Sequence, residues 1–406
     1  MCRLVYSNDK NERLLTILTY VLCFTGCFNL AILKTNLDFQ CFFILLVIIL
    51  IISLSLFILK RYFSTGDKFI FILSCILSFI GILMIYRLEP DSALKQLIWF
   101  SIGVTGFIFI VMFLQNIKKY SKLKYLFLAL TIIFTPLALI FGKDIYGAKN
   151  WIEIGNFSFQ PSEMGKLFLV AYLAASLKDY KDRKDLIQPA IVVMVFLFIM
   201  VLQTDLGTAL IVFAVSITML YIATSKFKYV LFCLLLFAFG AVISYFLFAH
   251  VRVRVETWLN PMVDPNGESY QIVQSLIAIA NGGLFGKGLG LGYPGLIPVN
   301  VSDFIFSAIC EEMGILTGIA IIIINFMLFY RCMRNAVYVK DMFSRLLVIG
   351  YSSMLAIQVF IIVGGVTNMI PLTGVTLPFV SYGGTSMIYS YLSIGIIQKI
   401  SEEDKA

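Results

Sequence analysis

A polar stretch at residues 250–301 separates two apolar segments and contains the residue types best suited to chemistry. It holds three carboxylates and three cations: Glu256, Asp264, Glu268, Arg252, Arg254 and Lys287. Carboxylates suit proton transfer, and cations stabilise developing negative charge. Asp264 is the candidate chemical centre. It also opens an Asp-Pro-Asn-Gly turn signal, so a turn-forming role is the alternative.

The part of this stretch that follows the turn reads as a short interfacial helix. Tyr270, Gln271 and Gln274 place polar tips along one helical face. A glycine-rich run follows at 281–290, but Lys287 precedes Gly288 rather than Ser or Thr. The run therefore lacks the phosphate-binding loop pattern, and a nucleotide site is excluded.

A second polar segment covers residues 147–163. Trp151 suits a membrane interface, and Pro161-Ser-Glu163 is typical of a helix start. Lys166 follows Glu163 by three residues and shares its helical face. The two side chains either cap and brace the helix or line a polar cavity within the membrane.

Two further segments interrupt apolar runs. Asp205 in Gln203–Thr208 can cap the helix that follows it at a corner of the chain. Residues 364–386 are rich in Gly, Pro, Ser and Thr, which favours broken helix at a cavity over loose helix packing. Asp303 opens the next apolar run, which contains Glu311 and Glu312. Adjacent helical residues point about 100° apart, so only one of these glutamates can face a given cavity squarely.

Composition identifies the elements that must position these residues. The 406-residue chain is 60% hydrophobic and 13% charged, with a net charge of +8. Soluble proteins carry about a quarter charged residues, so this is a polytopic membrane protein. The cations lie in short loops between apolar runs, which excludes a nucleic-acid surface. The eight cysteines show no metal or disulfide spacing.

Apolar runs predict an all-α membrane bundle of twelve spans. They cover residues 14–33, 40–59, 69–86, 94–114, 124–141, 162–177, 188–204, 206–223, 229–249, 302–330, 344–366 and 378–398. Most Lys and Arg residues fall on one side when both termini are placed in the cytoplasm. Loops 142–161, 250–301 and 367–377 then face outside.

Five motifs, in this order, resemble the SEDS family (shape, elongation, division and sporulation proteins, including FtsW, RodA and SpoVE). They are GAKNWIEIGNFSFQPSEMGKL at 147–167, QTDLGTAL at 203–210, DPNGESYQIVQSLIAIANGGLFGKGLG at 264–290, SDFIFSAICEEMG at 302–314 and PLTGVTLPFVSYGGTS at 371–386. The resemblance implies a ten-span core at 69–399. Residues 1–68 would add a cytoplasmic tail and two spans, and 400–406 a second cytoplasmic tail. The run at 84–91 resembles FtsW-like members.

The resemblance also implies an activity: polymerisation of lipid II, an undecaprenyl pyrophosphate-linked precursor, into peptidoglycan glycan strands at the bacterial plasma membrane. The family's essential acidic residue corresponds to Asp264, which we expect to be the general base. Cations would bind the pyrophosphate: Lys149, Lys166, Arg252, Arg254 and Lys287. The remaining predicted substrate-binding residues are Trp151, Glu163, Tyr270, Gln271, Gln274, Asp303 and Ser381. No residue is assigned to a metal, although the family admits a divalent cation such as Mg²⁺ or Mn²⁺.

The chain departs from the family pattern at two places. Asn150 precedes Trp151 where a basic residue is common, so Lys149 must supply any charge there. Val301-Ser-Asp replaces His-Thr-Asp, which excludes a histidine role at that point. A lipid II flippase and a non-catalytic scaffold are the alternative functions. The resemblance implies a class B penicillin-binding transpeptidase as partner, with other divisome or elongasome membrane proteins.

Overall fold

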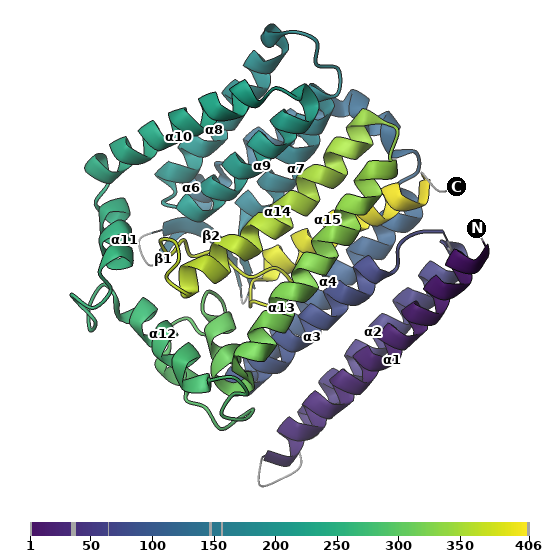
Figure 1. Ribbon diagram of the computed structural model, residues 1–406, viewed down its shortest axis with the longest axis vertical. Helices are drawn as coiled ribbons and strands as arrows, with labels where there is room; N and C mark the ends of the chain where they lie inside the picture. Colours follow the sequence, from purple (N-terminus) through teal and green to yellow (C-terminus); the bar gives the residue numbers. More distant parts are fainter. Residues whose placement is uncertain (1, 34–37, 64, 146–147, 156, 404–406) are drawn as a thin grey trace.

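Long helices follow almost every predicted span. The structure, a computed structural model, describes residues 2–33, 38–63, 65–145, 148–155 and 157–403. The fold is an all-α membrane bundle, as predicted (Figure 1). Its first half contains α1 (Cys2–Leu33), α2 (Phe39–Tyr62), α3 (Phe69–Leu88), α4 (Pro90–Phe113), a 3-10 turn at Ile117–Leu123, α5 (Lys124–Phe134), α6 (Leu137–Phe141) and α7 (Pro161–Leu177).

The second half begins with a 3-10 turn at Arg183–Leu186 and ends on the last helix of the bundle. It contains α8 (Ile187–Leu202), α9 (Leu206–Thr224), α10 (Phe227–Leu247), α11 (Ala249–Leu259), α12 (Tyr270–Gly282), a 3-10 turn at Pro294–Leu296, α13 (Ile305–Tyr338), α14 (Met342–Val366) and α15 (Gly384–Glu403). Residues 367–383 form no helix between α14 and α15. The broken helix predicted for this segment is therefore present.

Ten helices in the described chain are long and apolar enough to cross a membrane, compared with the twelve predicted spans. The two predicted spans outside this group form α7 and α15. α7 has only 17 residues and carries Glu163 and Lys166, while α15 carries Lys399, Glu402 and Glu403. Both helices are largely buried among other helices, so protein replaces lipid around their polar groups.

The segment 142–161, expected to be a loop, contains a small antiparallel sheet instead. Strands β1 (Lys143–Ile145), β2 (Ala148–Ile154) and β3 (Phe157–Phe159) pair in the order β1-β2-β3. Ile152 pairs with Phe159 and Ile154 with Phe157. Alternating β-branched and polar residues in β2 favour this pairing, although strands this short carry little signal in a single sequence.

Two predicted spans are interrupted. The helix predicted over 124–141 breaks at Thr135–Pro136 between α5 and α6, where proline cannot continue the hydrogen-bond ladder. α13 extends to Tyr338, beyond the predicted end at 330. It kinks at Gly314, whose φ of 85° suits glycine. Residues Leu284 to Gly286 pack against the kink, where a side chain would collide with their backbone.

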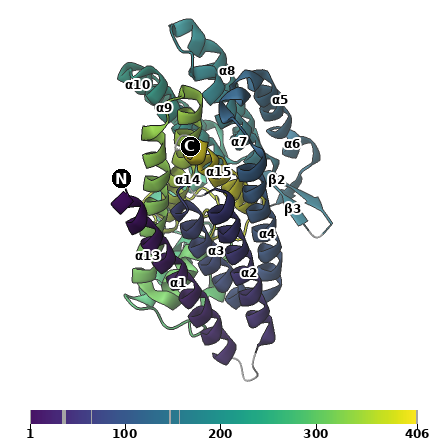
Figure 2. The same cartoon turned by 90° about the vertical axis from the view of Figure 1, so that its right-hand side faces the viewer.

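α3 lies at the centre of the bundle. Residues from Phe69 to Tyr86 are all buried, and α1, α4 and α13 pack around the helix. A Cβ on Gly81 would lie 2.2 Å from the carbonyl oxygen of Val380, so glycine permits the 367–383 segment to approach the helix. Figure 2 shows α1 lying along the outside of this group.

The helices α1 and α2 are fastened to the rest of the bundle near both ends of α3. Lys68 and Glu12 form a buried ion pair of 3.6 Å at one end. At the other end, the Tyr86 hydroxyl donates a 2.5 Å hydrogen bond to Asp38. Polar contacts thus dock the N-terminal hairpin on the core at both membrane faces.

The segments predicted to lie outside gather at one end of the bundle. Arg254 and Trp258 of α11 contact the chain at 368–373, and Gln160 contacts Thr385. At the opposite end, Arg331 pairs with Asp67, and the carboxylate of Glu403 accepts from the backbone at 116–117. Both termini lie toward that opposite end (Figure 1).

Candidate active site

A buried ion pair lies in the first turns of α7. Lys166 Nζ is 2.8 Å from Glu163 Oε1, and the side chains are 0% and 5% exposed. Pro161 starts the helix, which places Glu163 near its positive dipole end. Lys166 also lies 5.3 Å from the centre of the Tyr389 ring. Glu163 Oε2 has no hydrogen-bond partner among the described residues, so this carboxylate has acceptor capacity to spare.

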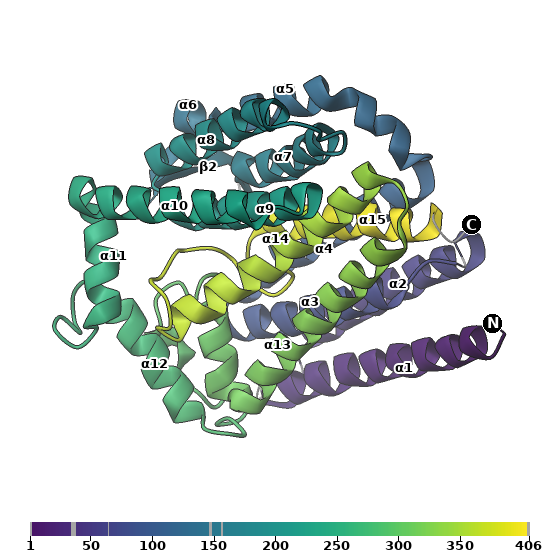
Figure 3. The same ribbon diagram turned by 45° about the horizontal axis from the view of Figure 1, so that its top comes forward.

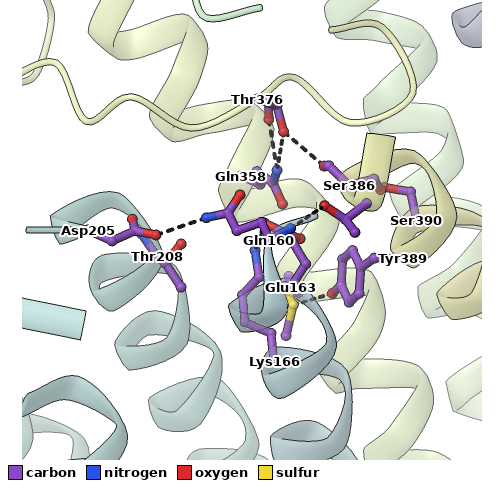
Figure 4. A network of polar contacts seen from close by, with 12 residues as sticks. Gln160, Glu163, Lys166, Asp205, Thr208, Gln358, Thr376, Ser386, Tyr389 and Ser390 are labelled. Atoms are coloured by element: carbon purple, nitrogen blue, oxygen red, sulfur yellow. Dashed lines mark hydrogen bonds and ion pairs between the residues drawn. The ribbon is translucent and has the colours of Figure 1, made fainter. Parts of the chain in front are cut away.

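A polar network above this pair joins α7, α9 and α15 (Figure 4). Gln160 Nε2 donates to Asp205 Oδ2 at 3.2 Å, and the Gln160 backbone N–H donates to Thr385 Oγ1 at 3.1 Å. Asp205 Oδ1 accepts from the Thr208 N–H at 2.9 Å. Asp205 therefore caps α9, as predicted, and its second oxygen extends the network toward α7.

The network is flanked by the irregular segment between α14 and α15. Gln358 Nε2 donates to the Thr376 carbonyl at 2.8 Å, and Thr376 Oγ1 donates to Ser386 Oγ at 2.8 Å. Figure 4 shows these groups beside Gln160 and above Lys166. The backbone groups freed by the helix break are thus satisfied in part by side chains of α14 and α15.

Arg254 reaches this region from α11. Its Nη1 donates to the Thr373 carbonyl at 3.4 Å, and its charge interacts with Asp205 and Asp303. Burial lowers the pKa of Arg254, while the two carboxylates oppose that effect. Loss of surrounding water raises the pKa of Asp303 to about 6, opposed by the Ser302 hydroxyl and by Arg254. The charge of Arg254 thus acts on two acidic side chains.

Ser381 is buried, and its hydrogen bonds are directed into the fold. Its hydroxyl donates to the Ser302 carbonyl at 2.6 Å and accepts from the Leu377 N–H at 2.8 Å. Its carbonyl accepts from Gln96 Nε2 at 2.9 Å. These bonds fix the turn that precedes α15 next to the start of α13.

Asp264 lies apart from these groups, in an exposed turn between α11 and α12. Its Oδ2 accepts from the Glu268 N–H at 3.0 Å, and its carbonyl accepts from the Gly267 and Ser269 N–H groups. The turn-forming alternative is therefore realised in this conformation. Tyr270 donates to the Leu296 carbonyl at 3.4 Å, and Gln271 and Gln274 are half-buried on α12.

The remaining candidate residues lie at the rim. Lys287 is exposed and pairs with Glu311 at 3.7 Å. Arg252 is exposed and donates to the Phe246 carbonyl at 3.3 Å. Lys149 is exposed on β2, with Trp151 half-buried on the same strand. The structure thus brings Glu163, Lys166, Arg254 and Asp303 to the polar interior and leaves the other predicted cations outside it.

Several polar residues of this interior were absent from the predicted binding set: Gln160, Asp205, Gln358, Thr376, Thr385 and Ser386. Gln358 carried a usable signal, because an amide inside an apolar run is costly and usually faces protein or water. Gln160 carried none, because it precedes Pro161 in a segment read as a loop.

Comparisons with known proteins agree with these features. The family model described as "Cell cycle protein", covering FtsW, RodA and SpoVE, matches residues 67–406. Peptidoglycan glycosyltransferase RodA of Mycobacterium tuberculosis is 36% identical, covering 84% of this chain and 79% of the relative. Stage V sporulation protein E of Bacillus subtilis is 33% identical, covering 83% of this chain and 97% of the relative.

Solved structures share the fold. A chain from a peptidoglycan synthase complex that coordinates polymerization and crosslinking aligns with a TM-score of 0.73 and 25% identity, covering 84% of this chain and 98% of that one. The rod shape determining protein RodA of Thermus thermophilus aligns with a TM-score of 0.65 and 22% identity, covering 84% and 98%. The second likeness concerns the fold alone.

Proposed function

Because this chain belongs to the FtsW, RodA and SpoVE family of cell cycle proteins, we propose that it is a peptidoglycan glycosyltransferase that polymerises lipid II. The single observation that supports this location of the site is the partly buried polar network in which α7, α9 and α15 meet, near the contact of α11 with the 367–383 segment. Intramembrane ionisable groups of this kind mark functional sites. The product would be glycan for cell division or cell-shape maintenance.

The network would face the outside of the bacterial plasma membrane. The cation-rich loops lie at the end of the bundle that holds both termini, and such loops remain cytoplasmic. The polar network lies at the other end, where a lipid-linked precursor on the outer leaflet could reach it.

In the proposed reaction a sugar hydroxyl of one chain attacks the anomeric carbon of another. The new glycosidic bond forms as the bond from that carbon to the pyrophosphate oxygen breaks, and the configuration inverts. Asp264 takes the hydroxyl proton as general base, and undecaprenyl pyrophosphate leaves with its electron pair. The exposed position of Asp264 leaves its second oxygen open to solvent and substrate.

We propose that cations near the polar network bind the leaving pyrophosphate. Lys166 and Arg254 are the candidates, because Lys166 is fully buried and Arg254 is half-buried. A cation with little water around it acts more strongly on a developing charge. Lys166 is paired with Glu163 in the resting protein, and the charge of Arg254 interacts with Asp205 and Asp303, so the pyrophosphate would compete with these carboxylates. Lys149, Arg252 and Lys287 would act at the rim as electrostatic guides.

A protein-held divalent cation fits this arrangement poorly. Among the described residues, no three His, Cys, Asp or Glu side chains gather closely enough to hold a metal ion. The carboxylates of Asp205 and Asp303 already share the charge of Arg254. We therefore route no step of the reaction through a metal.

The proposed partner is a class B penicillin-binding transpeptidase. A synthase complex that couples polymerization to crosslinking contains a chain of this fold. A single-span transpeptidase would crosslink the strands that this chain makes. Lipid II and the growing glycan are the proposed ligands in the polar network.

The test is glycan formation by purified protein and lipid II in detergent. Asp264→Asn retains an oxygen for the turn but loses the base, so polymer formation should fall about 100- to 10,000-fold. Glu268→Gln, which alters an exposed carboxylate in the same turn, should keep the unaltered rate. A near-normal rate for Asp264→Asn would contradict the base assignment. Vesicle translocation without any polymer from the unaltered chain would support a flippase instead.

A further inference from the structure

The turn that carries Asp264 is fastened at both of its ends to the same place, the C-terminal end of α14. On the α12 side, Ser275 Oγ lies 2.7 Å from Ser307 Oγ and 2.7 Å from the Val366 carbonyl, and these bonds are buried. On the α11 side, the Trp258 indole N–H donates to the Asn368 carbonyl at 3.2 Å. The Asn368 amide returns a hydrogen bond of 3.2 Å to the Trp258 carbonyl.

The hydrogen bonds that hold α11 lie in a less buried environment than those that hold α12. α10 and α11 contain no buried residue, whereas α12 packs along α13 and buries Ile272, Val273 and Ala278. Figure 3 shows α11 leaving α10 at a sharp angle and leading to α12. Apolar packing therefore holds α12 in place but contributes little to the position of α11.

Other polar contacts of α11 stay within the α10–α11 unit. Arg252 donates to Phe246, and the Tyr245 hydroxyl donates to Glu256 at 3.4 Å. Within the part of the chain that the structure describes, three hydrogen bonds join α11 to the rest of the bundle: the two of the Trp258–Asn368 pair and the bond from Arg254 to Thr373. The α11 end of the turn depends on these contacts.

The residue types suit this pairing. Asn368 has a φ of 58°, a left-handed conformation that asparagine adopts more readily than most residues with a side chain. This conformation turns the chain after α14, and the Asn368 carbonyl accepts the indole N–H while its amide donates back. Tryptophan adds a large apolar ring with one donor, which needs a partner when it leaves water.

We propose that Trp258 and Asn368 are positioning residues for Asp264: their two hydrogen bonds hold the α11 end of the turn, and with it the Asp264 carboxylate, in place during glycan transfer. This inference rests on the proposed function. The pair acts through the backbone that leads from Trp258 to Asp264 and touches no substrate. Releasing it would let the turn swing on its fixed α12 end.

The test compares variants that remove one bond each. Trp258→Phe removes the indole donor, and Asn368→Gly removes the amide donor while keeping the left-handed backbone and its carbonyl. Each should lower the rate of glycan formation about twofold to tenfold, and the double variant should lower it further. Asn300→Ala is the matched control, because it removes a 2.9 Å amide-to-carbonyl bond to Pro294 within the same outer region. It should keep the unaltered rate.

A crosslink separates positioning from a general structural role. Leu259 and Met369 are exposed neighbours of the pair, 60% and 69% respectively. In the double variant, Leu259→Cys and Met369→Cys joined by a short bismaleimide should restore most of the lost rate. The parent chain treated with the same reagent controls for its native cysteines.

Three outcomes bear on the inference. Unaltered rates in both single variants and the double would overturn it. Loss of activity on crosslinking a chain that retains Trp258 and Asn368 would also overturn it, because the turn would then need to move away. If the unaltered chain makes no glycan, the proposed function is contradicted instead. In that case a lower crosslinking yield between residues 259 and 369 when Trp258 and Asn368 are both replaced would still show that this pair holds α11 in place.

Discussion

At the scale of single residues, Glu163 and Lys166 form a buried ion pair in the interior of the molecule. Both side chains are almost fully withdrawn from water. Removing one partner of such a pair leaves a buried charge without compensation, at a cost of about 3–5 kcal/mol. Lys166→Met and Glu163→Gln should therefore each lower the thermal midpoint in detergent, and the Lys166→Met/Glu163→Gln double variant should recover part of the loss.

The matched comparison is a surface pair at the opposite, C-terminal end of the same helix. Lys178 and Asp179 are 3.5 Å apart and 26% and 78% exposed. Such pairs contribute about 0–1 kcal/mol. Asp179→Asn should leave the midpoint nearly unchanged, and an equal loss for both kinds of variant would show that burial does not matter here.

Asp303 should give the stability of the protein a pH dependence. Its pKa rises from 3.8 to about 6 on folding because the carboxyl loses water. Between these values the folded chain binds more protons than the unfolded chain, so stability falls as pH rises through that window. Asp303→Asn should make the thermal midpoint depend less on pH between pH 4 and pH 6. An unchanged slope in the variant would assign the dependence to another group.

At the scale of elements, the start of α9 fits closely against the segment between α14 and α15. A Cβ on Gly207 would lie 2.4 Å from a Val375 methyl and 2.9 Å from the Thr373 carbonyl. Gly207→Ala should cost about 1–3 kcal/mol through overpacking, measured as a lower thermal midpoint, and should slow glycan formation.

Gly240 offers the control for this prediction. It lies within α10 with nothing near its Cβ position. Gly240→Ala should be neutral or stabilise the chain by up to about 1 kcal/mol, since alanine favours helix. Destabilisation of similar size at both glycines would contradict the assignment of the Gly207 effect to its contact with Val375 and Thr373.

Periodicity and composition were enough to predict most of the long helices, but not the contacts among them. The break at 367–383 and the cap at Asp205 followed from local residue types. The kink at Gly314 did not, because it depends on the chain at 284–286 packing against it. The β1–β3 sheet escaped prediction because β1 and β3 are too short to show an alternating pattern.

The same limit applies to the site. Types and spacing identified the Glu163–Lys166 pair, since three residues along a helix fix a shared face. They could not separate Arg254, which reaches the interior, from Arg252, which remains exposed two residues earlier. That distinction depends on where α11 lies relative to α14, and only tertiary structure sets it.

At the scale of the whole molecule, the N-terminal hairpin lies outside the matched family region. α1 and α2 precede residue 67, where the family match begins, and the polar network involves neither helix. We expect a chain starting at residue 65 to insert and to make glycan at a rate within about tenfold of the full chain. The α3 face that α1 covers is apolar, so lipid can replace the lost packing.

The measurement is glycan formation alongside the thermal midpoint of the truncated chain. The midpoint should fall, because the Glu12–Lys68 and Tyr86–Asp38 contacts are lost. Lys68→Met in the full chain controls for removal of the ion pair alone. A truncated chain that inserts and is monodisperse but makes no glycan would assign the hairpin a part in catalysis.

The modest apolarity of α15 has a consequence for biogenesis. A helix that carries Lys399, Glu402 and Glu403 and falls short of an autonomous span enters lipid poorly on its own. α15 packs along α4, which the ribosome completes far earlier. We therefore expect α15 to insert by packing against helices that are already in the bilayer. Closure of the bundle from its C-terminus would complete both topology and active site, and a chain that stalls before α15 would remain an open, inactive membrane intermediate.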